Sequence, residues 1–172
     1  MKLLFAISGS TKTNSSNEKI LAFISDQFKE EANIEIYSCL KELPYFEPGL
    51  NEDQLPEKVK EFLSKINAAD AILISTPEYV FSLPGILKNG LEWTVASTVL
   101  SDKAVGIIVA AASGEKAFES LELIMSTLTQ SPIAPERKLL IKGIGKYIDG
   151  SGQITDKNIK AQLISLTKHL LS

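Results

Sequence analysis

Five short apolar runs alternate with five segments of helical periodicity along this chain, and no other feature constrains the fold as much. The first run, residues 3–7, is apolar at every position, which is typical of a strand covered on both faces. In the second helical segment, Val59, Phe62 and Ile66 recur with the spacing of one helix face. The pattern predicts strands at 3–7, 34–38, 71–75, 104–112 and 138–142, and helices around 21–28, 59–66, 86–98, 121–128 and 159–170.

Such alternation favours a parallel sheet with helices on both faces. Crossovers between parallel strands are right-handed, which leaves few arrangements to consider. Five strands suit the order 2-1-3-4-5, in which the chain reverses direction beside the first strand. Because 172 residues suit one hydrophobic core, we expect an α/β three-layer fold with residues 1–172 as a single domain.

Charge and cysteine content exclude several classes of protein. The formal net charge is −3 and acids and bases are mixed, so the chain lacks the basic field that nucleic acids or anionic membranes require. Cys39 is the only cysteine, which excludes an internal disulfide and a thiolate metal cluster, and we predict no metal site. No apolar stretch approaches the ~20 residues that span a bilayer, and the first apolar run ends too early for a signal peptide. We expect a cytoplasmic protein.

The loop after the first strand, "SGSTKTNSSN" at 8–17, is rich in hydrogen-bonding side chains. Ligands of open α/β sheets bind beyond the carboxyl ends of the strands, where the strand order reverses. The start of a helix offers free N–H groups and partial positive charge, and Lys12 adds a full charge. The Rossmann and P-loop motifs are both absent, so a single terminal phosphate suits this loop better than a triphosphate. The alternative is that Asn14 or Ser15 only caps the helix.

Two further unusual loops follow the third and fourth strands. They read "TPEYVFSLPG" at 76–85 and "ASGE" at 112–115. In the predicted order, strands 1, 3 and 4 are neighbours, so all three loops would meet at one edge of the sheet. Turns fixed by proline hold backbone groups that can read the edge of a flat heterocycle, while Tyr79 or Phe81 covers its face. The alternative is a proline-rich loop that packs into the core.

These loops carry motifs of a known family. Residues 9–17 resemble Gly-Ser-x-Arg-x-x-Ser-x-Asn, with Lys12 in place of Arg. Residues 77–93, "PEYVFSLPGILKNGLEW", resemble Pro-Glu-Tyr-Asn-x-Ser-x-Pro-Gly-x-Leu-Lys-Asn followed by an acidic residue and Trp, with Val80 in place of Asn. "AASG" at 111–114 resembles a third flavin loop, and the similarity covers nearly the whole chain. The sequence therefore resembles the NADPH-dependent FMN reductases, flavodoxin-like proteins that include azoreductases and chromate- or quinone-reducing members.

The resemblance implies a flavodoxin-like three-layer sandwich that binds FMN without a covalent bond and uses NAD(P)H as co-substrate. Hydride would pass from the nicotinamide through FMN to a flavin, quinone, azo compound or metal oxyanion. The cofactor-binding residues that the resemblance implies are Ser10, Lys12, Ser15, Ser16 and Asn17 in the first loop, Pro77, Glu78, Tyr79, Val80 and Ser82 in the second, and Ser113 and Gly114 in the third.

The resemblance also implies that the flavin carries the redox chemistry, so we predict no catalytic side chain. His169, near the end of the last helix, is expected to face solvent or that helix's C-terminal dipole, and Cys39 to be a small buried residue. Trp93 and Val95 either face the sheet with their helix or, as in the family, belong to a surface that packs on a second subunit of a homodimer or homotetramer. The alternative functions are a flavodoxin-type electron carrier and a non-redox FMN-binding module.

Overall fold

The five predicted strands form one parallel sheet. The computed structural model describes residues 1–172. The strands pair in the order β2-β1-β3-β4-β5, and every neighbouring pair is parallel. The predicted α/β class and strand order are therefore confirmed. The bounds of the strands are β1 (Lys2–Ser8), β2 (Ala32–Tyr37), β3 (Ala71–Thr76), β4 (Ala104–Ala111) and β5 (Lys138–Lys142).

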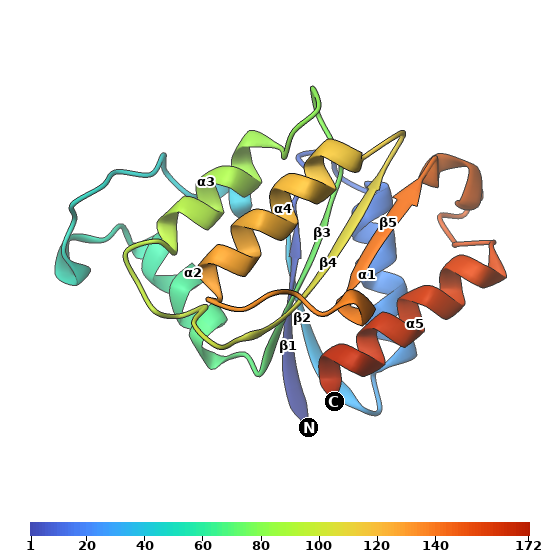
Figure 1. Cartoon of the computed structure of the whole chain (residues 1–172), viewed down its shortest axis with the longest axis horizontal. Helices are drawn as coiled ribbons and strands as arrows, with labels where there is room; N and C mark the ends of the chain where they lie inside the picture. Colours follow the sequence, from blue (N-terminus) through green and yellow to red (C-terminus); the bar gives the residue numbers. More distant parts are fainter.

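Helices cover both faces of the sheet, which gives three layers (Figure 1). One face carries α1 (Ser16–Gln27) and α5 (Lys157–Leu171), whose buried Ile20 and Leu163 share a core with Leu73 of β3. The other face carries α2 (Glu57–Ala68), α3 (Gly85–Trp93) and α4 (Glu115–Leu128), and its core is larger. Single turns of 3-10 helix lie at Leu40–Glu42, Glu52–Gln54, Pro135–Arg137 and Ile144–Tyr147.

Local sequence signals explain where the helices begin. Helix α1 starts behind Ser15, whose hydroxyl accepts the N–H of Glu18 while the Glu18 carboxylate accepts the N–H of Ser15. Asp156 caps α5 by accepting the N–H of Ile159. Pro56 and Pro84 precede α2 and α3, where a missing N–H costs no helical hydrogen bond.

Helix α3 is shorter than the sequence predicts. The prediction extended it to residue 98, but it ends at Trp93. The hydroxyl of Thr94 donates to the carbonyl oxygen of Leu91, and β-branched residues at 94 and 95 weaken a helix end further. Trp93 is buried, whereas Val95 is 64% exposed, so the alternative in which these residues face the sheet holds for Trp93 and fails for Val95.

Candidate functional site

The three unusual loops meet at one edge of the sheet, beyond the carboxyl ends of β1, β3 and β4 (Figure 1). Hydrogen bonds join the first loop to the end of β3, and the second loop to the third. The N–H of Gly9 donates to the carbonyl oxygen of Ser75 at 2.8 Å, and the hydroxyl of Ser113 donates to the Glu78 carboxylate at 2.9 Å. The predicted convergence of the first, second and third loops is therefore present in the structure.

Ser15 acts as the helix cap that the sequence analysis kept as an alternative. Its hydroxyl lies 3.1 Å from the N–H of Glu18 and its own N–H lies 3.3 Å from the Glu18 carboxylate. Ser10 is also buried, and its hydroxyl accepts the N–H of Lys12 at 3.2 Å. Both serines thus help to fix the loop, and each hydroxyl accepts a hydrogen bond within it, so its own proton can still be donated to an anion.

The side chain of Asn17 ties the first loop to the two neighbouring strands. It is 2% exposed, and its Oδ1 accepts the hydroxyl of Ser75 at 2.9 Å. Its Nδ2 donates to the carbonyl oxygen of Ala110 at 3.2 Å. These contacts use the side chain inside the protein, so the group that Asn17 offers to a ligand is its backbone N–H. Sequence reasoning missed Ser75 and Ala110, although Ser75 lies at the end of a strand next to the loop.

The first loop retains a set of donors suited to a phosphate. The N–H groups of Ser16 and Asn17 make no hydrogen bond in the first turn of α1, and the amine of the exposed Lys12 forms no ion pair. Gly9 allows the close approach of the chain, because a Cβ there would lie 2.4 Å from Oγ1 of Thr76. Backbone donors, hydroxyls and one ammonium group together are the kinds of group that bind a terminal phosphate.

The second loop narrows to a strained turn. Tyr79 and Ser82 exchange backbone hydrogen bonds of 3.0 and 3.1 Å, and between them Val80 and Phe81 adopt φ values of 51° and 56°. Two left-handed residues define the type I′ turn that glycine and asparagine favour, so a β-branched valine there is strained. Val80 is 94% and Phe81 76% exposed. The loop therefore presents an apolar tip at the edge of the site.

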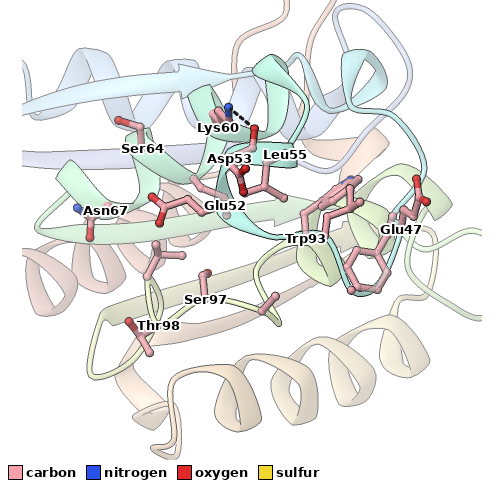
Figure 2. Close-up of a pocket in the computed structure, with 16 residues that line it drawn as sticks. Glu47, Glu52, Asp53, Leu55, Lys60, Ser64, Asn67, Trp93, Ser97 and Thr98 are labelled. Atoms are coloured by element: carbon pink, nitrogen blue, oxygen red, sulfur yellow. Dashed lines mark hydrogen bonds between the residues drawn. The ribbon is translucent and has the colours of Figure 1, made fainter.

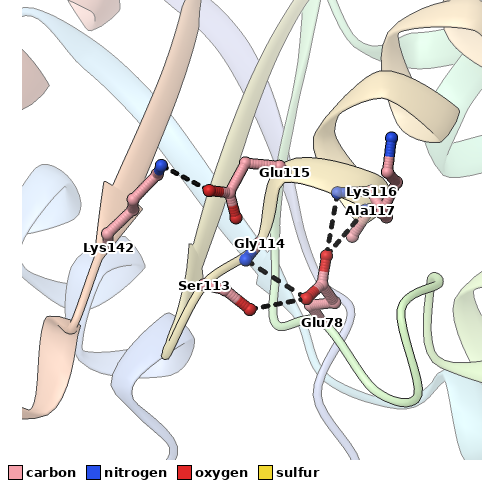
Figure 3. Close-up of polar contacts among 7 residues, drawn as sticks. All are labelled: Glu78, Ser113, Gly114, Glu115, Lys116, Ala117 and Lys142. Atoms are coloured by element: carbon pink, nitrogen blue, oxygen red, sulfur yellow. Dashed lines mark hydrogen bonds and ion pairs between the residues drawn. The ribbon is translucent and has the colours of Figure 1, made fainter.

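The carboxylate of Glu78 links the second loop to the third loop and to the first turn of α4 (Figure 3). One oxygen accepts the hydroxyl of Ser113 at 2.9 Å and the N–H of Gly114 at 3.2 Å. The other accepts the N–H groups of Lys116 at 2.9 Å and Ala117 at 3.0 Å. The N–H of Ala117 is the largest of the effects that lower the pKa of Glu78, and the other three donors act the same way. Glu78 is therefore ionised at neutral pH and bound to protein donors.

A wide hollow of about 1090 Å³ lies on another flank, between the 46–55 segment, α2 and the end of α3 (Figure 2). Trp93 and Phe46 pack edge to face in its lining, with their ring centroids 5.2 Å apart. Glu52 and Asp53 also line it, and the amine of Lys60 donates to the Asp53 backbone oxygen at 3.2 Å. An acidic hollow away from the strand ends does not suit a phosphate, so this hollow is not the predicted flavin site.

Of the two predictions outside the loops, the one for Cys39 is wrong and the one for His169 is confirmed. Cys39 is exposed, so the expectation of a buried cysteine was wrong. Partial burial and the neighbouring Glu42 carboxylate raise the pKa of its thiol, which favours the unreactive protonated form. His169 is exposed on the last turn of α5, as predicted, with Nδ1 2.8 Å from the carbonyl oxygen of Ser165.

The chain is similar in sequence to a family of flavin reductases. The profile of the family described as NADPH-dependent FMN reductase matches residues 1–141. The NADH:(hydroxy)cinnamate reductase subunit CrdA of Vibrio ruber is 32% identical over 92% of this chain and 80% of that protein. The NADH-dependent flavin reductase subunit 2 of Lactobacillus johnsonii is 30% identical over 91% of this chain and 88% of its own length.

Solved structures show the same fold. The flavoenzyme NAD(P)H:(acceptor) oxidoreductase FerB of Paracoccus denitrificans superposes with a TM-score of 0.73 at 18% identity. The superposition covers 99% of this chain and 96% of that one. At this identity the likeness establishes the arrangement of strands and helices, and the chemistry has to be argued from the loops themselves.

Proposed function

Because the chain belongs to the NADPH-dependent FMN reductase family, we propose that its three loops form an FMN site from which electrons reach a small acceptor. The chain is an FMN-dependent NAD(P)H oxidoreductase. The observation that carries the assignment of the site is the set of donors at the start of α1, beside two joined loops at neighbouring strand ends. We take residues 1–172 as one FMN-binding domain.

In this proposal the phosphate lies at the N-terminus of α1. The N–H groups of Ser16 and Asn17 donate to it, the hydroxyls of Ser10 and Ser15 support it, and Lys12 supplies the positive charge. A lysine offers a point charge, whereas the family's arginine offers a planar pair of donors. The orientation of the phosphate is therefore set mainly by the backbone N–H groups.

The ring system lies between the second and third loops in the same proposal. Pro77 and the Tyr79–Ser82 turn limit its movement on one side, and Ser113 with Gly114 closes the other. When bound, FMN would supply the redox chemistry between the nicotinamide and the acceptor. The protein positions the ring and leaves its outer edge open beside the exposed tip at Val80 and Phe81. Free flavins, quinones, azo compounds and metal oxyanions are all proposed acceptors.

Anaerobic reduction tests this function. Apoprotein saturated with FMN and separated from the excess should lose its yellow absorbance within minutes of adding NADPH, with NADH as the parallel reaction. Apoprotein without FMN is the control for absorbance changes of the nucleotide itself. A flavin that stays oxidised would indicate a flavodoxin-type carrier, and protein that takes up no FMN would indicate a non-redox module.

A second candidate is the electron-donating subunit of a larger reductase. The Vibrio ruber and Lactobacillus johnsonii relatives are both named as subunits, which favours a protein as the final acceptor. Rapid bleaching by NADH or NADPH combined with slow turnover of free FMN, quinone and azo dye would support this candidate. Rapid steady-state turnover with a small acceptor would favour a self-sufficient enzyme.

We also propose that the chain forms a homodimer or homotetramer in the cytoplasm. Exposed apolar side chains at Tyr45 and Val95 stand on the α3 flank, where a second subunit would cover them. A single free cysteine suits a reducing compartment. No helix is long and apolar enough to cross a membrane. Light scattering during gel filtration measures the oligomeric state, and a monomeric mass at micromolar concentration would contradict this part of the proposal.

A further inference from the structure

Glu78 joins two loops that lie far apart in the sequence. Its carboxylate receives four hydrogen bonds from Ser113, Gly114, Lys116 and Ala117, between 35 and 39 positions further along the chain. Figure 3 shows the side chain pointing from the second loop toward the first turn of α4. Every side-chain hydrogen bond between these two loops ends on this carboxylate.

Helix α4 depends on this carboxylate because it has no cap of its own. Its N-cap residue is Gly114, which has no side chain and adopts φ 105°. This φ is strained for any residue with a side chain, and a Cβ here would also lie 2.9 Å from Cδ1 of Leu140, so a capping serine or aspartate is disfavoured. Glu78 replaces the missing cap from outside the helix and satisfies backbone donors that would otherwise be unpaired.

No cation forms an ion pair with Glu78. The nearest basic side chains on α4 and β5 have other partners, since Lys116 pairs with Glu119 and Lys142 pairs with Glu115. The negative charge is therefore held by backbone N–H groups and by the N-terminal dipole of α4. A carboxylate offers about four acceptor positions, and four donors occupy them.

We propose that Glu78 is a positioning residue, which holds the second and third loops at the separation that the flavin ring requires and does not itself bind FMN. This role rests on the proposed function, because it assigns the ring of FMN to the space between those loops. It differs from the role of a cofactor ligand that the family motif implies for Glu78. The fixed loops would be present before the flavin binds, which reduces the entropy lost on binding.

The substitution Glu78→Gln tests the role with little change in shape. An amide keeps one acceptor oxygen, but its NH₂ group replaces the other and faces an N–H donor. We expect the dissociation constants of FMN and riboflavin, measured by quenching of flavin fluorescence, to rise by about the same factor, roughly tenfold. The visible circular dichroism of the bound flavin at saturation should also change, because the ring then lies between loosened loops.

Glu115→Gln is the matched control. It removes the same charge from the same helix end, but Glu115 contacts Lys142 and makes no hydrogen bond to the second loop. Its flavin affinities and spectrum should match those of the unchanged protein. Ser113→Ala removes one of the four donors and should weaken the binding of FMN and of riboflavin by the same factor, smaller than for Glu78→Gln. This variant decides the question if Glu78→Gln does not fold.

The outcomes separate the positioning role from its competitors. Unchanged affinity and spectrum in folded Glu78→Gln overturn the proposal, as does an equal loss in Glu115→Gln. A loss for FMN with none for riboflavin also overturns it, because Glu78 would then act on the phosphate. Unchanged protein that binds neither flavin overturns the proposed function, and the role of Glu78 in flavin binding falls with it.

Discussion

The first loop and the pair formed by the second and third loops use anchors in opposite ways. The Asn17 side chain anchors the first loop to the sheet through Ser75 and Ala110. It leaves the backbone N–H groups at the start of α1 free. Glu78 anchors the other pair by consuming the donors at the start of α4. One helix N-terminus is therefore open to an anion, and the other is closed by an internal carboxylate.

In the proposed FMN site, this difference lets one sheet edge recognise two ends of the ligand. An open helix start attracts a phosphate, whereas a second open start under the ring would compete for the same group. With Glu78 in place, the third loop is fixed and the start of α4 has no free positive pole to offer the proposed ring site. Lys12 is the one charged side chain in the first loop.

Removing the anchor of the first loop should have the largest effect. Asn17→Ala leaves the Ser75 hydroxyl and the Ala110 carbonyl oxygen buried without their partner, which costs about 2–4 kcal/mol of unfolding free energy. Urea unfolding of the apoprotein measures it. Ser16→Ala, at the next position and with no side-chain hydrogen bond in the structure, should change stability by less than about 0.5 kcal/mol. Equal stability of both variants would show that Asn17 is not an anchor.

Removing the positive charge of the first loop should have the next largest effect. It should change the affinity for FMN and leave the stability of the protein unchanged. Lys12→Ala should raise the dissociation constant of FMN by roughly 10- to 100-fold, since a hydrogen bond to a charged group contributes about 1.5–3 kcal/mol. Riboflavin, which lacks the phosphate, should bind as before. Lys19→Ala, one turn into α1, is the control for net charge. Equal losses for both flavins in Lys12→Ala would contradict the phosphate assignment.

A second substitution at residue 12 also tests whether this residue acts on the phosphate and not on the ring. Lys12→Arg restores the residue of the family motif, whose planar fork can bind a phosphate through two donors. It should bind FMN at least as tightly as the unchanged protein, with no gain for riboflavin. A gain shared by both ligands would place residue 12 beside the ring.

Much of this arrangement was predictable from the sequence, because it depends on local patterns. Apolar runs and helical spacing predicted the strand order, and loop composition predicted which strand ends carry the site. The anchors were not predictable in their detail. The roles of Asn17 and Glu78 depend on partners 58 and 39 positions away, which only the packed sheet brings within hydrogen-bonding distance. The motif named both residues, but it could not distinguish a ligand from a support.

Strain in the second loop provides the smallest and most specific test. Val80 occupies a left-handed position, φ 51°, where the family motif has asparagine. Left-handed backbone costs an ordinary residue about 1–2 kcal/mol, and asparagine tolerates it better because its short side chain forms local hydrogen bonds. Val80→Asn should therefore raise the unfolding free energy by about 1 kcal/mol, although it removes an apolar side chain.

The matched control for this strain is Val95→Asn. Val95 is also exposed, at 64%, but its φ is not positive, so asparagine should bring no gain in stability there. Thermal unfolding of the apoprotein compares the two variants, and a difference of about 1 kcal/mol corresponds to roughly 2–4 °C in a chain of this size. Equal shifts would mean that the turn relaxes around Val80 in solution. A gain at Val80 alone would mean that the second loop holds strain, which the first loop avoids by placing asparagine at its own left-handed position, Asn14.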